Sequence, residues 1–65
     1  MVGFPDRMLL VPGGTITFVE LKTRRGRVSK IQVFWHRVLA GMGYRVEVVR
    51  TVEEFRRVLT ASTVL

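Results

Sequence analysis

Two runs rich in apolar and β-branched residues predict two β-strands in the first third of the chain. Residues 7–11 form a short, mostly apolar run, and in residues 15–22 apolar and β-branched side chains surround the charged pair Glu20 and Lys22. Between them, the sequence Pro-Gly-Gly at positions 12–14 supplies the positive φ angles that hairpin turns use. We therefore expect an antiparallel hairpin. It would bring Asp6, the last residue of an irregular segment from Met1, toward the far end of the second strand.

Apolar residues at helical spacing predict one long helix. They follow the pattern i, i+3, i+4, i+7, i+8, i+11 and are Ile31, Phe34, Trp35, Val38, Leu39 and Met42. Ser29 and Gln32 have the form of a capping box at the helix start, and Gly43 is a typical residue after a helix end. The stripe is expected to face the core or an interface.

The rest of the chain predicts a third strand, Tyr44–Val49, and a short second helix. Thr51 and Glu54 form a second capping box, and the helix is expected to run to about Leu59. Its inward residues would be Phe55, Val58 and Leu59. The element order is β-β-α-β-α, and a helix between the second and third strands allows these two to be parallel. The predicted fold class is α/β, a mixed sheet flanked by helices, in a single domain spanning residues 1–65.

The segment Phe18–Lys22 places two charges on an otherwise apolar strand. Because alternate residues of a strand face the same side, Glu20 and Lys22 would project side by side. Charged groups are costly to bury unless they are paired or bind something. One interpretation is a salt bridge at the strand end. The other is a binding site that also includes Asp6, which follows Pro5 upstream.

Composition and charge indicate which kinds of partner the chain is expected to bind. The 65 residues are close to the lower limit for a self-sufficient core, so a homodimer is expected. Lys and Arg outnumber Asp and Glu by 11 to 5, which favours a polyanion such as nucleic acid over ordinary solubility charge. There is no cysteine for disulfides or thiolate metal sites. Without a span-length apolar run or a signal peptide, we expect no membrane association and a cytoplasmic protein.

These residue types suit phosphodiester hydrolysis. A divalent cation prefers hard oxygen ligands, which Asp6 and Glu20 can supply, with the backbone carbonyl of Leu21 as a third. Lys22 would be the cation near the attacking water and the phosphate. The expected contacts to the DNA backbone are a basic loop and its flanks: Arg7, Arg24, Arg25, Arg27 and Lys30.

The order and spacing of the motifs resemble a known family. They are Gly3-Phe-Pro-Asp-Arg7, Pro12-Gly-Gly14, Phe18-Val-Glu-Leu-Lys22, Ser29-x-x-Gln32-x-x-Trp35 and Gly43-Tyr-x-Val-x-Val-Val-Arg50. Together they closely resemble the virus-type replication-repair nuclease (VRR-NUC) domain of the PD-(D/E)XK nuclease superfamily, over roughly residues 3–55. The resemblance implies a restriction-endonuclease-like core, Mg²⁺ or Mn²⁺ on Asp6 and Glu20, and Lys22 positioning or activating water. It also implies that Gln32 lines the active site, a role that competes with the capping box.

The function implied by the resemblance is a metal-dependent, structure-selective DNA endonuclease in replication or repair. Small members of the family look like phage or bacterial homodimers acting on branched DNA, such as four-way (Holliday) junctions or flaps. The family usually has a further helix, often with an acidic residue, before the Gly-x-Pro-Asp motif, and here only Met1 and Val2 precede Gly3. We therefore expect a truncated chain, cover from a partner, or a site that works with two carboxylates.

The sequence also allows two other classes of function and leaves the roles of Trp35 and His36 open. A non-catalytic DNA-binding module on a nuclease scaffold would bind DNA with or without metal. A structural oligomerisation protein explains the long helix but not the paired acids. Trp35 is expected in the core, with base stacking as its alternative. His36, with no second His or Cys, is expected at the surface or in contact with DNA.

Overall fold

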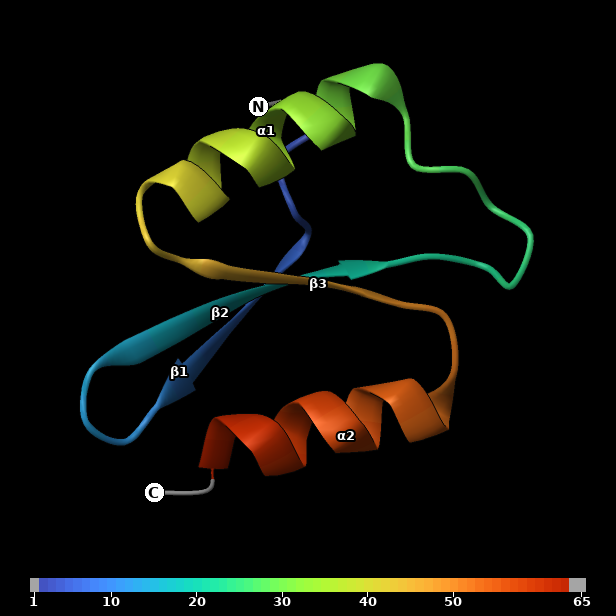
Figure 1. Cartoon of the computed structure of the whole chain (residues 1–65). Helices are drawn as coiled ribbons and strands as arrows, with labels where there is room; N and C mark the ends of the chain where they lie inside the picture. Colours follow the sequence, from blue (N-terminus) through green and yellow to red (C-terminus); the bar gives the residue numbers. More distant parts are fainter. Residues whose placement is uncertain (1, 64–65) are drawn as a thin grey trace.

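Five elements follow one another in the order that the sequence predicts. A computed structural model of the chain describes the backbone of residues 2–63 and the side chains of residues 2–60. The elements are β1 (Arg7–Val11), β2 (Thr15–Leu21), α1 (Lys30–Gly41), β3 (Arg45–Val49) and α2 (Val52–Thr63), as Figure 1 shows. Residues 2–6 contain neither helix nor strand, as expected, whereas Met1 lies outside the described residues.

The three strands form one mixed sheet in the order β1-β2-β3. Strands β1 and β2 are antiparallel, with Arg7 opposite Val19 and Val11 opposite Thr15. Strands β2 and β3 are parallel, which confirms the predicted crossover through α1. The central strand β2 is the most buried, because each of its edges is paired and each of its faces is covered by a helix.

The helices lie on opposite faces of the sheet (Figure 1). On the α2 face, Val19, Val49 and Val58 form a buried aliphatic cluster, with Leu9 and Phe55 packed against it. On the α1 face, the packing is aromatic. Phe18 meets Phe4 and Tyr44, and Phe4 in turn meets Trp35 of α1, all in edge-to-face geometry with ring centroids 5.4–5.5 Å apart. Trp35 is half-buried and packs against Phe4, so the expectation that it belongs to the core is confirmed in part.

Side-chain caps define where both helices begin. The Ser29 hydroxyl accepts a hydrogen bond from the Gln32 N–H (3.2 Å), and the Gln32 amide oxygen accepts one from the Ser29 N–H (2.8 Å). At α2, Thr51 caps the N–H of Glu54 (3.1 Å), but the Glu54 carboxylate accepts from the Arg50 N–H instead of completing the box at Thr51. Helix α2 extends to Thr63 and not only to about Leu59, because no Gly or Pro interrupts residues 60–63.

The apolar stripe of α1 is only partly buried. Leu39 is in the core, but Ile31, Phe34 and Met42 are 44, 54 and 68% exposed. Leu59, expected to face inward on α2, is 37% exposed. The reason is the size of the sheet, since three strands are too narrow to cover every apolar position of two helices. None of the helices within residues 2–63 is long and apolar enough to cross a membrane.

Candidate active site

The hairpin brings Asp6 to the end of β2. The Leu21 N–H donates a hydrogen bond to the Asp6 Oδ1 over 3.3 Å, although the two residues are 15 positions apart in sequence. The backbone of Asp6 is held as well, because the Arg7 Nη1 donates to the Asp6 carbonyl oxygen (2.9 Å). The sequence-based placement of Asp6 beside the far end of the second strand is therefore confirmed.

The carbonyl group of Leu21 points to the same edge of β2 as Asp6. The peptide between Leu21 and Lys22 is trans, so its C=O and N–H point in opposite directions. The Lys22 N–H donates to the Val49 carbonyl of β3 (2.9 Å). The Leu21 carbonyl must therefore point away from β3, toward the edge where Asp6 binds, which is the arrangement that a shared cation would need.

Glu20 is buried between β2 and α1. It is 3% exposed, and its Oε1 lies 3.6 Å from the Nε2 of His36 on α1, whose side chain is 16% exposed. Both atoms are buried and have no hydrogen-bond partner. Among the described residues, Glu20 forms no salt bridge with Lys22, so that interpretation of the strand is wrong. The expectation that His36 lies at the surface is also wrong, whereas its alternative, a contact with DNA, stays a prediction.

The position of His36 follows from the orientation of α1. Gln32, His36 and Leu39 are spaced i, i+4, i+7 and share one face of the helix. This face is more buried than the one carrying Phe34 and Ile31. The helix is therefore rotated so that the face with Gln32, His36 and Leu39 is the more buried one, while Ile31 and Phe34 are exposed. The i, i+4 spacing of a His after the family's glutamine was the sequence signal that could have revealed it.

Gln32 is engaged in the helix cap. Its amide oxygen is used by the Ser29 N–H, as described above. The capping role is therefore confirmed. The role of Gln32 in lining the active site stays a prediction, and its amide NH₂ group would carry that role.

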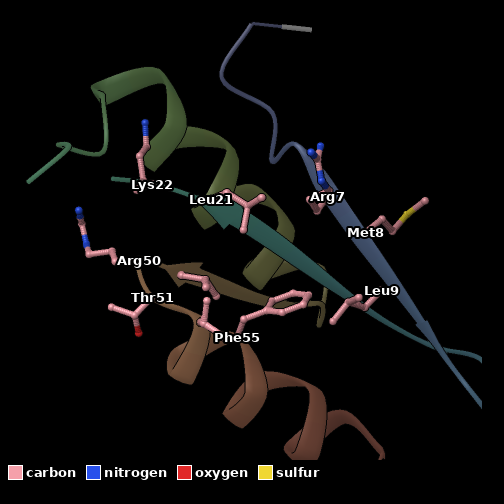
Figure 2. Close-up of a pocket in the computed structure, with 10 residues that line it drawn as sticks. Arg7, Met8, Leu9, Leu21, Lys22, Arg50, Thr51 and Phe55 are labelled. Atoms are coloured by element: carbon pink, nitrogen blue, oxygen red, sulfur yellow. The ribbon is translucent and has the colours of Figure 1, made fainter. Parts of the chain in front are cut away.

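Lys22 follows β2 directly and lies beside a hollow of about 380 Å³ on the α2 face of the sheet. Figure 2 shows this hollow, with the apolar side chains of Leu9, Leu21 and Phe55 around it. The Lys22 side chain comes from the end of β2 and points away from Phe55 (Figure 2). Its ammonium group is therefore directed away from the apolar side chains around the hollow.

A basic loop, residues 23–27, continues from Lys22. Its turn is closed by a hydrogen bond from the Gly26 N–H to the Thr23 carbonyl (3.1 Å). The Arg50 guanidinium donates to the carbonyls of Thr23 (2.9 Å) and Gly26, so this arginine holds the loop in shape. The basic side chains that the sequence predicts to contact DNA are exposed to solvent: Arg7, Arg24, Arg25, Arg27 and Lys30. The loop thus presents its arginines outward, and Arg50 is the residue that supports its shape.

The donor atoms at the end of β2 suit a hard divalent cation. Asp6 and Glu20 provide carboxylate oxygens and Leu21 a carbonyl, the ligands that Mg²⁺ and Mn²⁺ prefer. Among the described residues, no lysine or arginine pairs with the buried Glu20 carboxylate, so a bound cation would compensate its charge. Within the described residues, no three His, Cys, Asp or Glu side chains gather closely enough to hold a metal by themselves. The residues therefore fit an ion bound by two carboxylates and completed by water or phosphate, and not a closed cage.

A mixed sheet that gathers two carboxylates and a lysine at one strand end, beside an arginine loop, is the layout of a nuclease-type domain. The VRR-NUC domain family matches the chain over residues 1–53, and the chain belongs to this family. No curated protein and no solved structure matches the chain significantly. The family membership implies a nuclease-type, hydrolytic function and DNA as the partner.

Proposed function

We propose that the protein is a divalent-metal-dependent DNA endonuclease that hydrolyses phosphodiester bonds in structured DNA. The observation that carries the proposal is the approach of Asp6 to the end of β2, where Glu20, Leu21 and Lys22 follow one another. We further propose that the mixed sheet and two helices are the restriction-endonuclease-like core, within a single domain of residues 1–65.

Each residue at the strand end has a proposed role. Asp6, Glu20 and the Leu21 carbonyl hold Mg²⁺ or Mn²⁺, which when bound makes water more acidic and neutralises charge on the phosphate. Lys22 orients the attacking water and stabilises the negative charge that develops on the phosphate oxygens. The amide oxygen of Gln32 is fixed by the helix cap. Its NH₂ group donates to the water or the phosphate.

The proposed substrate is DNA recognised by shape, such as a four-way junction or a flap. Arginine contacts to phosphate fix the position of a protein on DNA but carry no sequence information. The exposed cations next to Lys22 lie on an irregular loop and at a helix start, and not along a helix face that could enter a major groove. This distribution supports recognition of backbone geometry over base sequence.

A panel of labelled DNAs tests the proposal. Four-way junction, flap, duplex and single strand are incubated with Mg²⁺, Mn²⁺ or EDTA. We expect metal-dependent cleavage of a branched substrate, with Asp6→Asn and Glu20→Gln losing cleavage by about 10²-fold or more while still binding DNA. Lys22→Ala should stop turnover and still bind the metal, because its ammonium is not a ligand. Equal cleavage by wild type and both carboxylate variants would remove the mechanism.

One observation favours a second candidate function, a non-catalytic DNA-binding module. Asp6 Oδ1 already accepts the Leu21 N–H, and within the described residues no group of three ligating side chains is assembled. Such a module would bind the same DNAs equally well in metal and in EDTA and would cut none of them. The same panel therefore separates the two candidates.

We also propose that the protein acts as a homodimer. The support is the apolar surface left on α1, where Ile31, Phe34 and Met42 are 44–68% exposed. Together with the small sheet, this surface is the feature that a second copy would cover. Sedimentation at micromolar concentration tests the oligomeric state, and a monomer would contradict this part of the proposal.

A further inference from the structure

Glu20 and His36 leave a pair of polar atoms facing each other in the interior. The distance from Glu20 Oε1 to His36 Nε2 is 3.6 Å, and the side chains are 4 and 16% exposed. Neither atom has a hydrogen-bond partner. Unpartnered polar atoms in the interior are costly, and native structures pair nearly all of them. The distance exceeds that of an ordinary N–H···O bond by about 0.6–0.7 Å, so a shift of this size would bring the two atoms into a hydrogen bond.

We propose that His36 is a positioning residue for Glu20. The Nε2–H of its ring donates to Glu20 Oε1, and this contact fixes the carboxylate so that its second oxygen is directed to the divalent cation. The histidine is not itself a ligand in this proposal, in agreement with the absence, among described residues, of a three-member ligating cluster. The cation part rests on the proposed function, whereas the contact between the two side chains does not.

Helix α1 is anchored well enough to impose the position of the ring. Its first turn is fixed by the Ser29–Gln32 capping box, one turn before His36. Leu39, three residues later, is 5% exposed and packed in the core. Between them, the Trp35 Nε1 donates to the Val2 carbonyl (3.1 Å), which ties the helix to the segment that carries Asp6. Because α1 is anchored before and after His36, the imidazole ring has a fixed position next to the Glu20 carboxylate.

A matched pair of substitutions tests the role. His36→Gln keeps an N–H donor, whereas His36→Leu keeps the bulk without a donor. Outer partners that orient metal ligands typically change metal affinity by 10- to 100-fold. We therefore expect His36→Leu to bind Mn²⁺ or Ca²⁺ about 10-fold or more weakly by calorimetry in the absence of DNA. His36→Gln should recover most of the affinity. Circular dichroism verifies that both variants fold.

The second readout is the imidazole signal in metal-free protein. His36 is the single histidine of the chain, so its ¹⁵N and ¹H ring resonances are unambiguous by NMR. A contact to the carboxylate predicts that Glu20→Gln shifts the Nε2 resonance, while Glu47→Gln, a carboxylate paired with Arg45 on β3, leaves it in place.

The outcomes separate this inference from the proposed function. Equal metal affinity in His36→Leu and wild type, or equal loss in both His36 variants, would overturn the positioning role. An unmoved Nε2 resonance in Glu20→Gln would overturn the contact. If no DNA is cleaved while metal affinity and the resonance respond as expected, the endonuclease proposal fails and the role of His36 stands. If the wild type binds neither ion, the positioning role falls together with the metal mechanism.

Discussion

Replacing Gly3 by alanine should destabilise the protein through two separate effects. Gly3 has a φ of +81°, in the region that residues with a Cβ rarely adopt. It also lies against helix α1. A Cβ built there would be 2.8 Å from both γ-carbons of Ile31 and 3.0 Å from the Ile31 backbone carbon. Since backbone is among the close atoms, a side-chain rotation of Ile31 alone cannot relieve the contact.

The expected loss is a large part of the total stability. The positive φ costs about 1–2 kcal/mol for a residue with a Cβ, and forced overpacking a further ~1–3 kcal/mol. A chain of 65 residues has a free energy of unfolding of roughly 3–10 kcal/mol at the usual per-residue value. Together these terms cost about 2–5 kcal/mol. The lower entropy of the unfolded chain offsets about 0.4–1 kcal/mol of this, so Gly3→Ala is expected to lose about 2–4 kcal/mol.

Gly13→Ala is the matched control. Gly13 has a φ of +96° in the hairpin turn, and a Cβ there would meet nothing within 4 Å. This variant isolates the backbone term, so it should lose only about 1–2 kcal/mol. Urea unfolding followed by the fluorescence of Trp35, the single tryptophan, measures both variants. If Gly3→Ala loses no more than Gly13→Ala, the close approach of the N-terminal segment to α1 is refuted.

Two further predictions concern DNA binding and self-association. Arg25→Gln should reduce the salt slope of DNA affinity by about 0.9, so the loss of affinity between 50 and 200 mM salt becomes roughly 3.5-fold smaller. Arg50→Gln should leave that slope unchanged, because its guanidinium is bound to loop carbonyls; a larger slope change than in Arg25→Gln would contradict this assignment. Phe34→Ser, at a side chain 54% exposed, should change the unfolding free energy by only about 0.5 kcal/mol and weaken dimerisation in sedimentation equilibrium. Unaltered self-association would exclude this part of α1 as the interface.

The number, order and type of the elements followed from the sequence alone. Runs of apolar and β-branched residues predicted the strands, and Pro-Gly-Gly predicted a turn whose glycines Gly13 and Gly14 do have positive φ. These signals are local, since the period of apolar residues and the φ preference of glycine act within a few positions. Because a hairpin fixes its own register, the approach of Asp6 to the end of β2 was also available from the sequence.

Local signals gave the ends of helices with less success. The capping box at Ser29 predicted the start of α1 correctly, because cap chemistry involves neighbouring residues. The end of α2 was predicted too early, since the apolar pattern fades after Leu59 while nothing in the following residues stops the helix.

Only the tertiary structure decided which face of α1 meets the sheet. The apolar stripe is only partly buried, since Ile31 and Phe34 stay exposed, and the helix presents His36 to Glu20. Likewise, the hydrogen bonds from Arg50 to the loop carbonyls join residues 24 and 27 positions apart. A period along one element specifies which side chains share a face. The rotation of that face depends on what the sheet offers opposite it, and such pairings of distant residues form only when the whole chain packs.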